Sequence, residues 1–314
     1  MATVEEILPE LHDAKVFSTL DIRNGFWHVE LTDESSKVTV FWTSFGRYMW
    51  KRLPFGLSCS PEIFQAKLQQ ALHGLKGIEV LVDDILCVGR GSTDEEAIVD
   101  HNRNLEALLQ RCQSKGIKLN RSKSKMNQIE VRFFGHVLSR DGLKPDPSKT
   151  AAISEMPQPR DAAELQRFLG LATYMAKFIS KLSELSRPLR EVLVSEEWHW
   201  GKQQAEAYRA LKQKIAEITV LKYYNPKLEA TIQCDASSYA VGAVLLQEGH
   251  PLMFASRTLT ATERRYAQIE KETLAILFSC KRFDQYIFGQ KHVTVQSDHQ
   301  PLQTIFKKPL SEVP

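Results

Sequence analysis

The chain has 314 residues, of which 43% are hydrophobic and 25% are charged, and this composition excludes a mainly disordered protein. The length accommodates two or three domains with ordinary cores, and no apolar run approaches the ~20 residues that a membrane span requires. The net charge of +3 is too small to indicate a nucleic-acid partner by itself.

Two features of the sequence bear on its cellular compartment. The N-terminal MATVEEILPEL carries acidic residues where a signal peptide would carry basic and then apolar ones, so we expect an intracellular protein. The five cysteines lie far apart, without CxxC spacing or a nearby pair of histidines. We therefore expect reduced thiols in the core: Cys59, Cys87, Cys112, Cys234 and Cys280.

The first segment alternates quickly between short apolar and polar pieces. Residues 16–22 (VFSTLDI) predict a β-strand that ends on an acidic residue. The runs 26–31, 37–43 and 47–53 also alternate, and residues that favour turns separate them. This pattern predicts a meander of antiparallel strands.

Two helices and a hairpin are predicted next. Pro61 opens an amphipathic helix that ends before Gly74, and an acidic start predicts a second helix over residues 93–115. Between them, IEVLVDDILCVGRG predicts two apolar strands joined at a pair of aspartates. Residues 111–125 contain six Lys or Arg residues and no acid. Such a run either contacts phosphates or is a solvated surface.

The proline-rich stretch 145–159 predicts a linker, with a domain boundary near Lys144 to Asp146. Beyond it, the 3.6-residue periodicity predicts two amphipathic helices within residues 161–193 and a third over 203–218. Three strands over 231–259, a long helix over 262–289 and a strand after residue 291 follow. The order β-β-β-α-β indicates a mixed α/β layer.

Adjacent aspartates between two apolar strands are the most informative short feature. Asp83 and Asp84 would lie at the tip of a hairpin, where carboxylates either stay hydrated in a plain polar turn or hold a cation. Asp21 ends an earlier strand and could lie beside them. Three acids so placed can bind two hard cations ~4 Å apart, which is the arrangement used in phosphoryl transfer.

Several motifs in order resemble one family. FSTLDIRNGF, LPFGLSCSPEIFQ, VLVDDIL, GIKLN and VRFFGHVLSRDGLKPDP are similar to successive motifs in the reverse transcriptase of gypsy-type LTR retrotransposons. An ordered set of motifs is far more specific than any single one. The resemblance runs through nearly the entire chain and continues into a ribonuclease H region.

The resemblance implies the fold and its division. We expect an α+β reverse transcriptase palm (an antiparallel sheet with helices) over residues 1–144, a helical thumb over 145–195 and a helical connector over 196–222. An α/β ribonuclease H-like domain would occupy 223–314. Both terminal parts would be incomplete, because fingers normally precede this palm and more helix with a fourth acid normally follows. The chain would then be part of a Pol polyprotein.

The resemblance also assigns polymerase residues. Asp21, Asp83 and Asp84 would be the catalytic metal ligands. Phe26 would pack under the incoming sugar, although it could equally be a core aromatic residue on a strand. The family's usual aromatic residue two places before the aspartates is replaced by Leu81, which cannot donate a hydroxyl hydrogen bond. The remaining assignments are Phe55 and Gly56 beside nucleotide and template, and Phe134, Gly135 and His136 in the primer grip.

A second acidic trio matches the ribonuclease H domain of the same family. Asp235 ends the first strand of that region, and Asp298 follows its last strand. The family register selects Glu272 on the intervening helix, although Glu270 also lies at the edge of the apolar face and either could be a solvated charge. His299 is interpreted as structural. These three acids would hold two metal ions that support hydrolysis of the RNA strand of a hybrid.

The resulting hypothesis is an RNA-directed DNA polymerase with ribonuclease H activity and two Mg²⁺ ions per active site, with Mn²⁺ as an alternative. Its partners would be an RNA template, a DNA primer, RNA–DNA hybrids and deoxynucleoside triphosphates, with other Pol or Gag segments and no membrane. We expect it inside the cell, in cytoplasmic retroelement particles, with entry into the nucleus as an alternative. A non-catalytic nucleic-acid-binding relic of the same element is the alternative. An unrelated metal-dependent nuclease ranks last, because it leaves the LPFG motif and the Asp83–Asp84 hairpin without a role.

Overall fold

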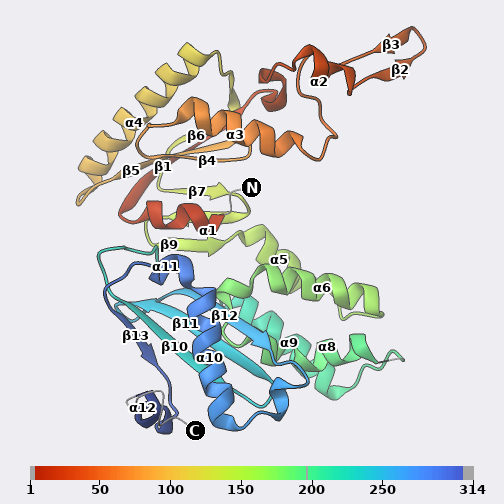
Figure 1. The fold of residues 1–314 in the computed structure, drawn as a ribbon, viewed down its shortest axis with the longest axis vertical. Helices are drawn as coiled ribbons and strands as arrows, with labels where there is room; N and C mark the ends of the chain where they lie inside the picture. The colour runs from red at the N-terminus through yellow and green to blue at the C-terminus, as the bar shows by residue number, and fades with distance from the viewer. Residues whose placement is uncertain (1–3, 196, 307–314) are drawn as a thin grey trace. The chain divides into compact units, whose positions relative to one another are not determined.

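The computed structural model describes residues 4–195 and 197–306. The chain divides into two compact units, residues 1–140 and 141–314, and each is described by itself (Figure 1). This division falls a few residues before the boundary that the prolines indicate. None of the described helices is long and apolar enough to span a membrane.

A four-stranded antiparallel sheet forms the centre of the first unit. Its order is β4-β5-β1-β6, so that β1 lies between β5 and β6. Alternate residues of β1 and β5 pack with two helices, α3 (Ser60–Leu72) and α4 (Asp94–Lys115), in one hydrophobic cluster, which includes Leu20, Ile85 and Phe64. The strands are β1 (Ala14–Ile22), β4 (Ile78–Leu81), β5 (Asp84–Arg90) and β6 (Leu119–Gln128).

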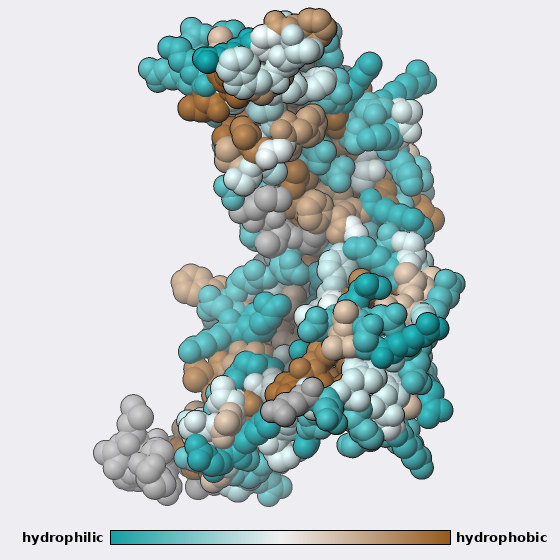
Figure 2. Space-filling model, turned by 90° about the vertical axis from the view of Figure 1, so that its right-hand side faces the viewer, coloured by the Kyte–Doolittle hydropathy of each residue, from teal (hydrophilic) through white to brown (hydrophobic). Residues whose placement is uncertain are grey.

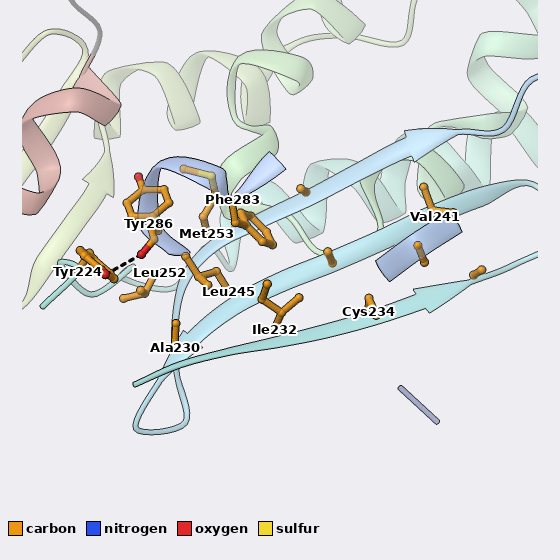
Figure 3. Packing of buried hydrophobic residues seen from close by; sticks show 14 of the residues in the cluster. Tyr224, Ala230, Ile232, Cys234, Val241, Leu245, Leu252, Met253, Phe283 and Tyr286 are labelled. Carbon is orange, nitrogen blue, oxygen red and sulfur yellow. Dashed lines mark hydrogen bonds between the residues drawn. The ribbon is translucent and has the colours of Figure 1, made fainter. Parts of the chain in front are cut away.

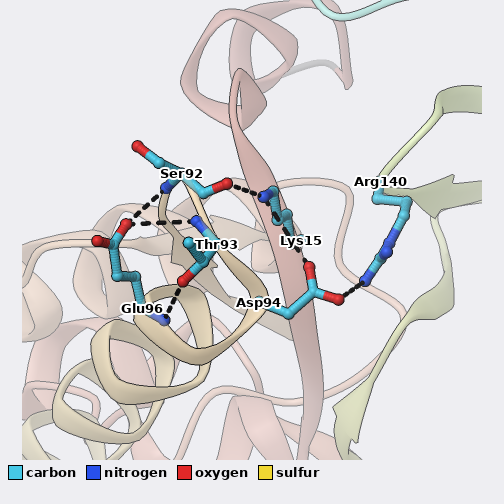
Figure 4. Close-up of polar contacts among 6 residues, drawn as sticks. All are labelled: Lys15, Ser92, Thr93, Asp94, Glu96 and Arg140. Carbon is cyan, nitrogen blue, oxygen red and sulfur yellow. Dashed lines mark hydrogen bonds and ion pairs between the residues drawn. The ribbon is translucent and has the colours of Figure 1, made fainter.

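The two long helices of this unit begin and end where the sequence predicts. Helix α3 (Ser60–Leu72) has a proline in its first turn. Helix α4 (Asp94–Lys115) starts with a capping box between Thr93 and Glu96 and ends at a glycine in the left-handed region. Figure 4 shows this start. There Lys15 of β1 and Arg140 both approach the Asp94 carboxylate, at 3.9 and 3.0 Å, and connect the start of α4 to these two segments.

The predicted meander of strands after β1 is only partly correct, since its runs pair through one short hairpin and an isolated antiparallel bridge between Glu30 and Arg52. Residues 26–31 form no strand but overlap a 3₁₀ helix, η2 (Gly25–His28), and α2 (Asp33–Lys37) follows it. Only a short exposed hairpin forms beyond them, from β2 (Phe41–Thr43) and β3 (Gly46–Tyr48). The alternating aromatic side chains contact one another in tilted pairs instead of facing a sheet core, as the Phe41 ring does with those of Tyr48 and Trp50.

Large apolar side chains of this hairpin remain accessible to solvent, with Phe45 88% exposed. Figure 2 looks onto the side where the hairpin lies in Figure 1, and hydrophobic side chains are interspersed among hydrophilic ones there. The first unit is completed by α1 (Val4–Ile7), η1 (Leu8–Leu11) and a second hairpin of β7 (Glu130–Phe133) and β8 (His136–Ser139).

Helices open the second unit, and they correct the predicted linker. After β9 (Gly142–Pro145), residues within the proline-rich stretch form helix α5 (Pro147–Glu155). Asp146 caps it by accepting a hydrogen bond from the Ser148 amide, and Pro147 occupies the first turn, where the missing N–H costs nothing. The prolines therefore flank a helix and do not replace it.

The next predicted helices are only partly correct. Helix α6 (Ala162–Tyr174) and helix α9 (Lys202–Ala216) form as expected. The second helix predicted within residues 161–193 is divided into η3 (Ala176–Phe178), α7 (Leu182–Leu185) and α8 (Arg187–Val194). Lys181 adopts a left-handed backbone (φ 54°) before α7, which interrupts the helix, and Pro188 lies in the first turn of α8.

The remainder of the second unit is a sheet of order β12-β11-β10-β13, in which β13 runs parallel to β10 and the other pairs are antiparallel. Helix α10 packs on it, and side chains from both layers form one core (Figure 3), in which Ile232, Leu245 and Phe283 are fully buried. The strands are β10 (Ala230–Ala236), β11 (Ala240–Gln247), β12 (His250–Thr258) and β13 (Val293–Gln296).

The β-β-β-α-β order is thus present, but the long helix predicted over residues 262–289 is shorter and divided. It consists of η4 (Glu263–Arg265), α10 (Gln268–Arg282) and α11 (Asp284–Ile287), and α12 (Pro301–Phe306) follows β13. None of the described cysteines is in a disulfide. Four are buried or half-buried as expected, whereas Cys59 is exposed.

Candidate active sites

The hairpin aspartates lie beside the end of β1. Antiparallel pairing places Asp21 of β1 directly opposite Asp84 of β5, and Leu81 of β4 faces Asp84 from the other side. Val82 and Asp83 form the turn, with Val82 in the left-handed region (φ 59°). That backbone costs a β-branched residue ~1–2 kcal/mol, so the surrounding sheet holds the turn in a strained form.

Electrostatic repulsion marks this group. Burial and, after it, the neighbouring charges of Asp83 and Asp21 together raise the pKa of Asp84 to about 6. The Lys123 ammonium, 3.5 Å from Asp21 Oδ2, acts in the opposite direction. Among the described residues these three acids do not meet within the 4.8 Å that the second trio achieves. Their mutual repulsion nevertheless favours a cation at this place.

Aromatic side chains border the same hairpin. The Phe26 ring lies 4.9 Å from that of Phe55 and 5.5 Å from that of Phe64, between ring centroids. Gly25 allows this approach, because a Cβ there would lie 3.1 Å from the Phe64 ring and 3.7 Å from Asp83 Cβ. Gly56 follows Phe55 with a left-handed backbone (φ 91°). Phe26 is therefore a packing residue, and Gly25 beside it lies close to Asp83.

The residues predicted for the primer grip form the tip of the β7–β8 hairpin. Phe134 and Gly135 both have left-handed backbones (φ 48° and 77°), and Phe133 pairs with His136 across the turn. His136 is buried, with Nδ1 3.1 Å from the Phe134 oxygen. The hairpin packs against β1, the strand that carries Asp21.

A basic cavity of about 1020 Å³ lies on the same unit, and the motifs did not reveal it. Its lining includes the Trp27 ring and several cationic side chains. Glu30 also lines it, but this carboxylate is paired with Arg52 at 2.8 Å. The cations are Arg23, Arg52, Lys67, Lys115 and Lys118, and the last two belong to the basic stretch of residues 111–125.

The second acidic trio converges in the sheet of the second unit. Asp235 lies on β10, Glu272 on α10 and Asp298 just after β13. One ligand oxygen from each lies within 4.8 Å of the others, and among the described residues this is the only such set of three acidic, His or Cys side chains. Because β13 pairs in parallel with β10, both aspartates come to the same edge of the sheet. Hard divalent cations prefer this all-oxygen donor set.

Glu272 is the most constrained member of this trio. It is 3% exposed, and its Oε1 accepts a hydrogen bond of 2.7 Å from Gln268, whose amide also donates to the Ala236 oxygen. Among the described residues no group hydrogen-bonds its Oε2. Burial raises the pKa of Glu272, and the charges of the two aspartates raise it further. A buried carboxylate oxygen without a partner is the kind of group that a cation satisfies.

The structure thus distinguishes the two glutamates that helical periodicity alone left open, in agreement with the choice of Glu272 from the family resemblance. Glu270 is exposed and caps its own helix by accepting a 2.7 Å hydrogen bond from the Ala267 amide. Gln268 is a site residue that sequence reasoning missed, although its spacing of four residues from Glu272 was an available signal. His299 is half-buried, and its charge opposes the rise in the pKa of Glu272.

Comparisons with known proteins agree with this geometry. Residues 2–138 match the family of reverse transcriptases (RNA-dependent DNA polymerases), and residues 200–295 match the RNase H-like domain found in reverse transcriptase. These families use divalent metal ions. The two matches contain five of the six predicted acids. The sixth, Asp298, lies three residues beyond the second match.

Relatives cover nearly the entire chain. The chain is 32% identical over 317 residues to the retrovirus-related Pol polyprotein from transposon gypsy of Drosophila melanogaster, which matches 96% of this chain and 30% of that protein. The Pol polyprotein from transposon 297 is 34% identical over 304 residues, with 96% and 28% covered. The enzymatic polyprotein of cauliflower mosaic virus (strain CM-1841) is 32% identical, with 94% and 44% covered. The chain therefore spans less than half the length of these relatives.

Solved structures are similar as well. The foamy viral protease-reverse transcriptase dRH in complex with double-stranded DNA superposes with a TM-score of 0.87 at 25% identity, covering 100% of this chain and 55% of that one. The foamy viral enzyme with an RNA/DNA hybrid gives 0.82 at 26% identity, covering 98% and 42%. The chain belongs to the gypsy-type retrovirus-related Pol polyproteins and carries a reverse transcriptase region followed by a ribonuclease H-like region.

Proposed function

We propose that this chain carries the centres for RNA-directed DNA synthesis and for cleavage of RNA in RNA–DNA hybrids. The observation that carries the proposal is the convergence of Asp235, Glu272 and Asp298 from three separate segments within 4.8 Å. A surface helix and two strand ends have no structural need to bring three carboxylates together. Such a cluster is unfavourable without a cation, so its presence supports a metal-dependent reaction.

In the ribonuclease H-like region, these three carboxylates would hold Mg²⁺, or Mn²⁺ as an alternative, with two ions in the site. Bound there, divalent ions lower the pKa of water and stabilise charge on the phosphate. Gln268 orients Glu272 through its 2.7 Å hydrogen bond, and the buried helix face fixes the depth of that carboxylate. Asp298 and Asp235 remain accessible, so that an RNA backbone can approach them.

In the reverse transcriptase region, Asp21, Asp83 and Asp84 would hold two metal ions of the same kind at the end of the β1–β5 pair. Phe26 would lie under the sugar of the incoming deoxynucleoside triphosphate. The loop with Phe55 and Gly56 would border nucleotide and template. Phe134, Gly135 and His136 would hold the primer end. Leu81 takes the place of the family's usual aromatic residue; its side chain is fully buried and has no hydroxyl, so it would offer the primer no hydrogen bond.

We infer that the partners are an RNA template, a DNA primer and their hybrid. The foamy viral relatives were solved with double-stranded DNA and with an RNA/DNA hybrid, and this chain shares their fold. The cationic cavity and the exposed Lys123 and Lys125 on edge strand β6 offer phosphate contacts. Cytoplasmic retroelement particles and other Pol or Gag segments remain part of this proposal as predictions.

The test separates two activities in the same chain. Primer extension on RNA and cleavage of a labelled hybrid are measured with Mg²⁺ for the unmutated chain, Asp84→Asn and Asp298→Asn. We expect Asp84→Asn to lower extension at least ~100-fold while cleavage persists, and Asp298→Asn to do the reverse. Asp33→Asn, an exposed acid in the first unit, serves as the control and should change neither.

Loss of both activities together in either variant would contradict two independent sites. An unmutated chain that binds a hybrid but neither extends nor cuts would favour the non-catalytic binding relic of the same element.

A further inference from the structure

A lysine forms an ion pair with one of the carboxylates of the ribonuclease H-like trio. Lys181 Nζ donates a hydrogen bond of 2.7 Å to Asp235 Oδ2, from 54 residues earlier in the chain. Both side chains remain accessible, with exposed fractions of 57% and 43%. The ammonium can therefore exchange with a cation from solvent without any opening of the core.

The backbone that presents this lysine is held in place. Lys181 precedes α7 with a left-handed backbone (φ 54°, ψ 32°), which costs a non-glycine residue ~1–2 kcal/mol and must be imposed by its surroundings. The imposing contacts are visible: Ser183 uses its amide and its hydroxyl to bond Ser256 Oγ of β12, each at 3.0 Å. Leu182 is buried beside them. These contacts thus hold the Lys181 backbone in place beside the acidic trio, while its side chain remains accessible.

We propose that Lys181 is a resident cation of the ribonuclease H-like site, which neutralises Asp235 in the metal-free protein and competes with the divalent ion for that carboxylate. The inference rests on the proposed function of the trio. Lys181 supplies one positive charge to an oxygen that a divalent ion would need, and its charge repels a second cation nearby. It thereby sets the metal concentration at which the site fills.

An ordinary surface ion pair is the competing explanation, and the two differ in what they predict. An exposed pair of this kind contributes little to stability. Removal of the lysine charge should therefore leave the unfolding midpoint in EDTA within about 2 °C, under either explanation. Only the resident-cation role predicts a change in metal affinity.

The experiment is direct Mn²⁺ binding, followed by electron paramagnetic resonance, to the full chain carrying Asp84→Asn to weaken the other acidic site. Lys181→Met removes the charge but keeps an unbranched apolar side chain, and Lys181→Arg keeps the charge. Lys202→Met removes a lysine that forms an exposed ion pair with Glu206 on α9 and is the matched control. We expect Lys181→Met to bind Mn²⁺ about five- to tenfold more tightly, with the other two unchanged.

An unchanged or weakened affinity in Lys181→Met would overturn the resident-cation role. Asp235→Asn separates that failure from failure of the proposed function. If Asp235→Asn weakens Mn²⁺ binding while Lys181→Met does not alter it, the metal site stands and the role of Lys181 fails. If Asp235→Asn binds Mn²⁺ as well as the parent does, no metal is held at Asp235, and both proposals fail.

Discussion

Replacement of Glu272 by glutamine should stabilise the metal-free protein while removing its function. Glu272 is buried, one of its oxygens lacks a hydrogen-bond partner among the described residues, and two aspartate oxygens lie within 4.8 Å. Glutamine has nearly the same shape and can still accept the hydrogen bond from Gln268. The substitution therefore removes a charge without opening a cavity.

The size of the effect follows from the distances. Two unit charges 4.8 Å apart repel by ~1 kcal/mol at the dielectric constant of water and by ~3.5 kcal/mol at an effective value of 20. Asp235 is already paired with Lys181 and Asp298 is exposed, so solvent screening keeps the total near the lower figure. A gain of about 1–2 kcal/mol corresponds to a rise of about 2–8 °C in the unfolding midpoint of a unit of this size.

Thermal unfolding in EDTA at pH 8, followed by circular dichroism, measures this gain, and hybrid cleavage measures the loss of function. Glu270→Gln is the matched control, because glutamine can keep the cap of α10 and that residue lies outside the trio. The pKa of Glu272 is raised, so the penalty of its ionisation accrues only as pH rises above the usual glutamate value. The gain should shrink near pH 4.5. A lower midpoint for Glu272→Gln than for the unmutated chain at pH 8 would refute the reasoning.

Two further predictions concern the fold. Burial and, after it, the charge of Glu10 raise the pKa of Glu79 to about 7. The free energy of unfolding should therefore fall by about 1–3 kcal/mol between pH 4.5 and 7 and stay level above pH 7. Urea unfolding measures this decline, which the Glu79→Gln variant should lack. Gly89→Ala should destabilise the protein by at least ~1–3 kcal/mol in the same assay, because the added Cβ would clash with the Ala97 backbone oxygen. Gly170→Ala on α6 is the contrasting variant: its added Cβ meets open space, so the substitution should stabilise the protein by ~0.5–1 kcal/mol.

Local signals predicted the elements whose stability is itself local. The capping box of Thr93 and Glu96, and the proline at the start of α3, define helix ends within a few residues of sequence. Apolar strands on either side of Asp83 fold back as a hairpin because the break in hydrophobicity and the turn coincide. The same signals misled where aromatic side chains alternate, because those residues form only the short hairpin β2–β3, in which rings such as Phe41 and Tyr48 contact each other and not a larger sheet core.

Long-range contacts decided the remaining features. Nothing near Lys181 in the sequence indicates a left-handed backbone or a carboxylate partner 54 residues away. The division of the helix predicted over residues 262–289 likewise follows from packing, since Phe283, at the break between α10 and α11, is fully buried in the sheet core.

The sequence by itself determined the acids and their order along the chain: Asp21 and the hairpin pair, then Asp235, a glutamate on a helix, and Asp298. Strand ends and helix periodicity are encoded by neighbouring residues, so these positions could be found without coordinates. Helical periodicity alone left Glu270 and Glu272 open, and the family resemblance selected Glu272. Only the tertiary structure gives the physical reason, because the packing of α10 on β10 turns Glu272 inward. It also showed that Lys181 contacts the Asp235 carboxylate, because that contact exists only once distant segments are packed together.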